Sequence, residues 1–228
     1  MRLRRLVAQL LCAALAAFGL LAAAPAPAAA STASAPTAVR GGDLLYGAGS
    51  RCVVGFNARN GSTYYAITSG VCGSPGTQWY ADPQRTVPVG VTERVVFPGS
   101  HYAIVRYTNT SLSYPSELNG GGGRIIRINR AAQPTVGQRV CRVGPTSGMH
   151  CGTVQAVNVS ITYPQGTVNG LFRTTVCAEP GDTGGPAFSG DTALGILVGG
   201  SGDCASGGST YYQPVVPILS ATGLVVGY

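Results

Sequence analysis

Residues 177–186 read Cys177-Ala178-Glu179-Pro180-Gly181-Asp182-Thr183-Gly184-Gly185-Pro186. Glycine and proline dominate this stretch, and both residues gather in any tight turn. The motif alone therefore predicts a turn and little more. Its meaning depends on three other segments of the chain: residues 67–72 (ITSGVC), 101–105 (HYAIV) and 199–204 (GGSGDC).

Together these segments resemble the catalytic motifs of streptogrisin-type serine proteases, which are secreted bacterial members of the chymotrypsin-like S1 family. Residues 64–65, 104–110 and 175–182 extend the resemblance, which runs in register from about residue 41 to residue 228. It implies an all-β fold of two six-stranded antiparallel β-barrels with a groove between them. The N-barrel would span about residues 41–118 and the C-barrel about 124–228, and a short C-terminal helix would cover 217–222.

The chain itself favours the same fold class. Short runs rich in Val, Ile, Thr and Tyr alternate with glycine-bearing turns, while helical periodicity is almost absent. Asn60-Gly61, between two such runs, predicts a hairpin whose two turn residues both have positive φ. The glycines of residues 120–123 interrupt the middle of the chain and predict the connection between the two barrels.

All three catalytic positions implied by the resemblance carry other residues. The family uses a hydroxyl nucleophile, an imidazole base and a buried carboxylate, and the matching positions are Thr183, Val71 and His101. Valine has no proton acceptor. Val198 stands where the family has a serine that helps to solvate the carboxylate, so four changes replace a charged network with a mostly apolar one.

The binding parts of the family's site are retained. Gly181 and Thr183 would supply the two N–H groups of an oxyanion hole, and Asp182 would form a buried ion pair with Arg142. The stretches that line the pocket place no acidic residue at its base, which favours a large apolar side chain. The strand edge expected to pair with an extended peptide consists of Val198, Gly199, Gly200 and Ser201. The alternative is that these glycines are kept only for loop conformation.

Two functions remain open at this stage. The first is a catalytically inactive homologue that binds an extended peptide or a protease-inhibitor loop. The second is an S1 peptidase with residual activity through Thr183, aided by His101. We expect no cofactor and no metal, and His150 has a matching histidine in active relatives.

The first thirty residues predict a secretory signal peptide, because a basic start precedes an apolar core and a small-residue cleavage site. Residues 31–40 would form a short leader without a full pro-segment. The mature protein is therefore expected to be secreted, extracellular and monomeric, without membrane association. All 15 basic residues are arginine, and the cluster of Arg124, Arg127 and Arg130 is interpreted as a solvated strand face and not as a surface for nucleic acid.

Six cysteines remain after the signal peptide, and an exported chain with six cysteines predicts three disulfides. The sequence alone leaves the pairing open. The resemblance implies that Cys52 pairs with Cys72 and Cys177 with Cys204, which leaves Cys141 to pair with Cys151.

Overall fold

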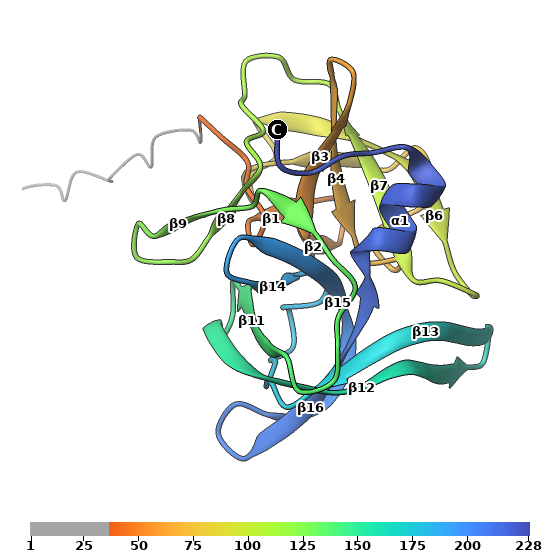
Figure 1. Ribbon diagram of the computed structural model, residues 1–228. Coiled ribbons are helices and arrows are strands. Elements are labelled where there is room, and N and C mark those ends of the chain that lie inside the picture. Colours follow the sequence, from red (N-terminus) through yellow and green to blue (C-terminus); the bar gives the residue numbers. More distant parts are fainter. Residues whose placement is uncertain (1–36) are drawn as a thin grey trace, which may run out of the picture. The chain divides into compact units, whose positions relative to one another are not determined.

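The computed structural model describes residues 37–228, which belong to one compact unit. The predicted signal peptide and residues 31–36 of the predicted leader lie outside the described residues. Two seven-stranded β-sheets form most of the unit (Figure 1). Within residues 37–228 no helix is long and apolar enough to cross a membrane.

The first sheet has the strand order β2-β1-β5-β6-β7-β4-β3. Its strands are β1 (Leu44–Tyr46), β2 (Arg51–Val53), β3 (Phe56–Asn60), β4 (Thr63–Thr68), β5 (Gln78–Tyr80), β6 (Pro88–Val96) and β7 (Tyr102–Tyr107). Every pairing in this sheet is antiparallel. Trp79 is fully buried inside it, and its indole N–H donates to the Thr92 hydroxyl at 2.7 Å, so the ring's one polar group is satisfied.

The second sheet has the order β10-β15-β14-β11-β12-β13-β16, and an additional β15–β16 pairing closes it into a barrel. Its strands are β10 (Arg130–Ala131), β11 (Arg139–Gly144), β12 (Gly148–Tyr163), β13 (Gly166–Thr174), β14 (Pro186–Ser189), β15 (Thr192–Asp203) and β16 (Gly207–Pro214). The chain reaches this sheet through a two-stranded hairpin of β8 (Glu117–Asn119) and β9 (Ile125–Arg127). It ends in α1 (Val215–Thr222), the predicted C-terminal helix.

The all-β, two-barrel prediction is confirmed, but its strand count and pairing differ in detail. Each sheet has seven strands where six were expected. In the second sheet the extra strand is β10, a two-residue part of the connection that runs parallel beside β15. A segment this short leaves no periodic pattern in the sequence, and the expectation of a wholly antiparallel barrel was wrong at this edge.

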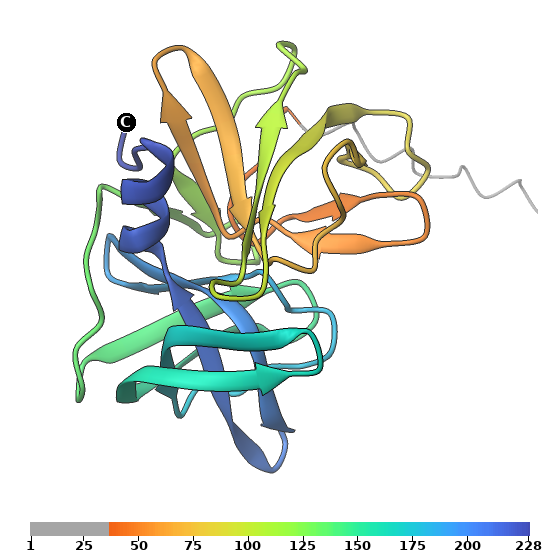
Figure 2. The same cartoon turned by 90° about the vertical axis from the view of Figure 1, so that its right-hand side faces the viewer.

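The two sheets share a hydrophobic core. Phe56 and Ile67 from the first sheet pack in one cluster with Phe188 and Ile196 from the second, and Val215 of α1 joins the same cluster. Figure 2 shows the yellow and orange strands of the first sheet and the green and blue strands of the second, with α1 beside both. This shared core fixes the position of each barrel relative to the other.

Residues 37–40, part of the predicted leader, pack against the first barrel. The N–H of Val39 donates to the Ser113 carbonyl at 3.0 Å, and the Val39 side chain is buried. Arg40 forms a 2.8 Å ion pair with Glu117.

The β3–β4 hairpin lies where the sequence placed it, but its turn is shifted by one residue. Asn60 is the last residue of β3 and pairs with Thr63, so the turn residues are Gly61 and Ser62. Only Gly61 has a positive φ, of 56°. The prediction of positive φ at both Asn60 and Gly61 was therefore wrong, and the geometry is that of a turn that needs glycine only at its first position.

We predict that Gly61→Val lowers the free energy of unfolding by about 1–2 kcal/mol, because a β-branched residue is strained at positive φ. Gly61→Asn should cost distinctly less, since asparagine tolerates this region. Nothing lies within 4 Å of a Cβ at this position, so steric clash does not contribute. Urea unfolding of the two variants tests this, and equal stabilities would contradict the assigned turn.

Candidate functional site

The loop at residues 181–185 has a conformation that only glycine allows at two positions. Gly181 has φ 102° and Gly184 has φ 91°. A Cβ on Gly184 would lie 2.7 Å from the Thr68 hydroxyl and 2.8 Å from the Val53 carbonyl, both in the first barrel. The Gly-Asp-Thr-Gly-Gly sequence thus lets a loop of the second barrel press directly against the first.

The buried side chain of Asp182 holds this loop in place. Its carboxylate is fully buried, lies 3.2 Å from Nη2 of Arg142 and accepts the Ser147 hydroxyl at 2.6 Å. The backbone N–H groups of Thr146 and Glu179 also donate to it, each at 3.0 Å. Burial alone would raise the pKa of Asp182, but these hydrogen bonds and the guanidinium lower it below its ordinary value, so the carboxylate is charged.

Arg142 is the expected partner of Asp182, and it holds a second part of the loop as well. Its Nε donates to the Cys177 carbonyl, and its Nη2 donates to the Ser147 hydroxyl. The ion pair, the start of the loop and the β11–β12 turn therefore form one hydrogen-bonded unit.

The segments that carry Val71, His101 and Thr183 meet at the groove. The N–H of Gly70 donates to Nδ1 of His101 at 3.2 Å, and a Cβ on Gly184 would lie 3.3 Å from the Ser69 nitrogen. The three side chains differ sharply in environment: Val71 is 61% exposed, His101 is buried at 2%, and Thr183 is half-buried. Among residues 37–228 the Thr183 hydroxyl has no hydrogen-bond partner.

His101 is held as a neutral ring. Because the Gly70 N–H donates to Nδ1, this nitrogen is unprotonated, and we assign the ring proton to Nε2. The Ser69 hydroxyl lies 3.3 Å from the same nitrogen, and the backbone N–H of His101 donates to the Gln213 side chain at 2.9 Å. Burial lowers the pKa of His101 below its ordinary value of 6.5.

The surroundings of His101 are largely apolar. The Phe97 ring meets it edge-on at 5.2 Å between ring centroids, and the Tyr163 ring lies at 6.2 Å. Val198 is 7% exposed and packs in one apolar cluster with two residues of β13. Position 101 therefore combines two polar neighbours, the Gly70 N–H and the Ser69 hydroxyl, with aromatic rings on the rest of the side chain.

Several backbone groups of the site have no hydrogen-bond partner among the described residues. Within residues 37–228 neither the Gly181 N–H nor the Thr183 N–H donates to a protein acceptor. Strand β15 pairs with β14 only as far as Ile196, and from Gly199 to Asp203 its ladder partner is β16. One edge of β15 at Gly199–Ser201 is thus open in the described part of the chain, and a Cβ on Gly199 would meet nothing within 4 Å.

Several contributors to this site were not singled out from the sequence. Ser69 is the third residue of the ITSGVC motif and could have been examined for its hydroxyl. Gln213 is 112 residues from His101 in sequence, and the two aromatic rings come from the residue after β6 (Phe97) and from the end of β12 (Tyr163). No local sequence pattern predicts that Gln213, Phe97 and Tyr163 contribute to the site.

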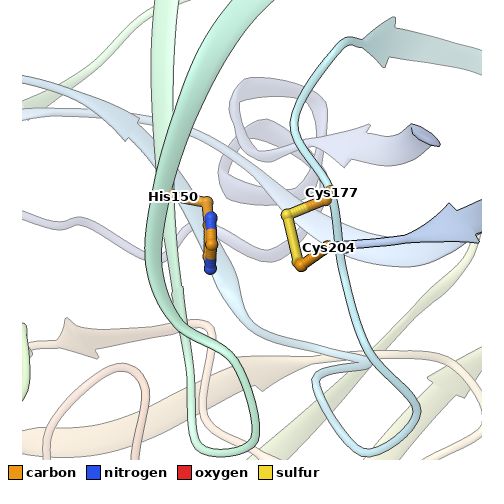
Figure 3. A group of neighbouring side chains, drawn as sticks. All are labelled: His150, Cys177 and Cys204. Atoms are coloured by element: carbon orange, nitrogen blue, oxygen red, sulfur yellow. A yellow bond between two sulfur atoms is a disulfide. The ribbon is translucent and has the colours of Figure 1, made fainter. Parts of the chain in front are cut away.

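Three disulfides connect the loops around the site: Cys52–Cys72, Cys141–Cys151 and Cys177–Cys204. The first and third are the pairs that the resemblance implied, and the second is the pair that was left over. Figure 3 shows His150 facing the Cys177–Cys204 bridge. The three side chains lie close enough to suggest a metal site, but the two sulfurs are bonded to each other and offer no thiolate. His150 Nε2 instead lies 2.9 Å from the Ser147 carbonyl.

The fold, the glycine-rich loop and the buried Asp182 define a protein of the trypsin-like class. A family model described as Trypsin matches residues 103–221. Streptogrisin-D of Streptomyces griseus is 46% identical over 190 residues, which are 83% of this chain and 48% of that protein. Streptogrisin-C of the same organism is 44% identical over 189 residues, 82% of this chain and 41% of that protein. The chain thus spans about half the length, or somewhat less, of these curated relatives.

A solved structure, described as alpha-lytic protease homolog N4, is 58% identical with a TM-score of 0.77 and covers 83% of this chain and 99% of its own. The chain therefore belongs to the trypsin family of serine proteases, in its streptogrisin-type branch.

We predict that His101 makes the protein less stable in mild acid. The unfolded chain protonates this histidine near pH 6.5, whereas the folded state resists protonation because its pKa is lowered. Stability should therefore fall as the pH drops below 6.5, by at most about 1.4 kcal/mol per pH unit. Urea unfolding between pH 8 and pH 5 should show a smaller loss in His101→Asn, and identical pH profiles would exclude this role.

Proposed function

We propose that this chain is a secreted, catalytically inactive homologue of streptogrisin-type serine endopeptidases that binds an extended peptide or a protease-inhibitor loop. The observation that carries the proposal is Val71, an exposed alkyl side chain at the position where the family's motif has the imidazole base. Matching the motifs residue by residue puts Thr183 at the nucleophile position and His101 at the carboxylate position.

The environment of Thr183 supports inactivity. A hydroxyl becomes a useful nucleophile when an adjacent base takes its proton, and the Thr183 hydroxyl has no such partner within residues 37–228. His101 is a poor substitute, because its Nδ1 already accepts the Gly70 N–H and its ring is buried against Phe97. Loss of triad members leaves about 10³–10⁴ of acceleration over water, which falls short of the 10⁶ or more that enzymes typically achieve.

The retained backbone geometry supports binding. An extended peptide can add to an open strand edge through main-chain hydrogen bonds, and β15 offers such an edge at Gly199–Ser201. The unpaired N–H groups of Gly181 and Thr183 would donate to a carbonyl oxygen of the same peptide. None of these interactions requires the residues at positions 71, 101 or 183 to be catalytic.

The proposal also covers the cellular location of the protein and the partners that it binds. Three disulfides are typical of chains that fold in oxidising compartments, which supports export. Arg127 and Arg130 lie within ion-pair distance of Glu117 and Asp191, which supports a solvated face rather than an anion-binding surface. We propose a monomer that engages neither nucleic acid nor membranes.

The second candidate is a serine-type peptidase with residual activity through Thr183. One observation favours it: the Thr183 hydroxyl is half-buried at the groove and free of hydrogen bonds to the described residues. A fluorophosphonate probe separates the two functions, because stoichiometric labelling at Thr183 requires an activated hydroxyl.

We predict that the purified protein does not hydrolyse casein or peptides with an apolar residue before the scissile bond, because no base activates Thr183. It should also remain unlabelled by a fluorophosphonate. A heat-treated sample and Thr183→Ala serve as controls. Turnover above the heat-treated sample that disappears in Thr183→Ala would refute inactivity.

We predict that the quadruple variant Val71→His, His101→Asp, Thr183→Ser, Val198→Ser gains measurable peptidase activity. The Gly70 N–H and the Ser69 hydroxyl already point at position 101 and would donate to the new carboxylate. Single reversions should gain almost nothing, because these residues act as a unit. A folded, peptide-binding but inactive quadruple variant would show that the scaffold no longer supports catalysis.

A further inference from the structure

Arg51, in β2, brings a positive charge to the rim of the Gly181 loop. A Cβ on Gly181 would lie 3.3 Å from Nη2 of Arg51 and 3.9 Å from its Cζ. The guanidinium thus stands within van der Waals reach of the residue whose N–H is unpaired. It approaches from the first barrel, while Gly181 belongs to the second.

The charge of Arg51 is not neutralised by the protein. No carboxylate within residues 37–228 forms an ion pair with it, and its guanidinium donates no hydrogen bond to a described residue. Asp182, the acidic residue next to Gly181 in sequence, already pairs with Arg142 and is fully buried. The side chain of Arg51 is exposed and available to a ligand.

Further donors gather at the same place. The N–H groups of Gly181 and Thr183 are unpaired, and the exposed Thr146 hydroxyl lies 2.8 Å from the Cβ position of Gly181. Adjacent backbone N–H groups form concave anion sites, and an arginine guanidinium binds a carboxylate in a planar, charge-assisted pair. This collection of donors beside an unpaired guanidinium has the chemistry of a carboxylate site.

We propose that Arg51, with the N–H groups of Gly181 and Thr183, binds the C-terminal carboxylate of a peptide that lies along the open edge of β15. This inference rests on the proposed peptide-binding function and narrows its ligand class to cleaved peptides. One carboxylate oxygen accepts the two N–H groups, and the other pairs with Arg51. Capture of a chain terminus by backbone N–H groups is an established mode of peptide recognition.

The positive charge of Arg51 would have different consequences in a receptor and in an enzyme. A neutral peptide bond gains little from Arg51, whereas the carboxylate released by hydrolysis gains a full ion pair. In an enzyme such a preference would retain the product and slow turnover, but in a receptor it selects the ligand. The ligand would be supplied by any peptide-bond hydrolysis that leaves a new C-terminus after an apolar residue.

The test is calorimetric titration at pH 7 and low salt with two matched peptides. Both have the sequence acetyl-Ala-Ala-Val-Leu, one ending in a free carboxylate and the other in an amide. The carboxylate form should bind at least about tenfold more tightly, since hydrogen bonds to charged groups are worth more than neutral ones. In Arg51→Gln the two peptides should bind within about twofold of each other.

Arg139→Gln is the matched control, because Arg139 is likewise exposed and forms no ion pair within residues 37–228. It should keep the full preference for the carboxylate. A block of the strand edge by Gly199→Phe should abolish binding of both peptides, and the Cβ that it adds meets nothing within 4 Å.

Equal affinity for the two peptides in the wild-type protein would overturn the carboxylate site and leave the peptide receptor standing. A preference that persists in Arg51→Gln, or that is lost equally in Arg139→Gln, would overturn the role of Arg51. Binding of neither peptide to the wild-type protein would count against the proposed function itself, and the inference would fall with it.

Discussion

The buried ion pair of Arg142 and Asp182 is the interaction on which the groove depends. Two charges with no solvent exposure need hydrogen bonds to offset the loss of water. Nη1 of Arg142 has no partner among the described residues, but the Asp182 carboxylate accepts the Ser147 hydroxyl and two backbone N–H groups. These donors come from two segments, the turn at Thr146 and Ser147 and the loop at Glu179, so neutralising one carboxylate also holds both segments in place. The orientation of the Gly181 and Thr183 N–H groups follows from it.

Under the proposed function, His101 at the carboxylate position would keep one function of that position and remove another. An unprotonated Nδ1 accepts the Gly70 N–H as a carboxylate oxygen would, so the backbone of the 67–72 segment stays in place. A neutral ring brings no charge, however, and so requires no polar shell. The Phe97 and Tyr163 rings can therefore pack against it, whereas beside an anion they would carry a desolvation cost. The apolar surroundings and the histidine are mutually consistent.

Much of this site could be anticipated from the sequence because its parts are local motifs. The glycines of residues 181–185, the cysteine pairs and the partner of Asp182 lie in segments that keep their spacing within the family. The hairpin turn was misplaced by one residue, because Asn-Gly predicts one turn type while the register of Asn60 with Thr63 selects another. β10 left no signal, since two residues of parallel pairing have no periodicity. Gln213 and Arg51 reach the groove through long-range packing, and only the folded chain brings them there.

Binding and catalysis make different demands on this scaffold, and under the proposed function this difference allows binding without catalysis. In the family's mechanism catalysis depends on the side chains at the positions matched by 71, 101 and 183, where a single change can remove a proton acceptor. Binding depends on backbone N–H groups and an open strand edge, which are fixed by glycine conformations, disulfides and the buried ion pair. Substitutions at the three side-chain positions leave those constraints untouched. Under the proposed function the ligand is selected by the groups around the Gly181 loop, and among the described residues the exposed guanidinium of Arg51 lies against that loop. On the inference drawn from Arg51, the scaffold would discriminate by the charge at the end of a peptide rather than by the reactivity of the bond within it.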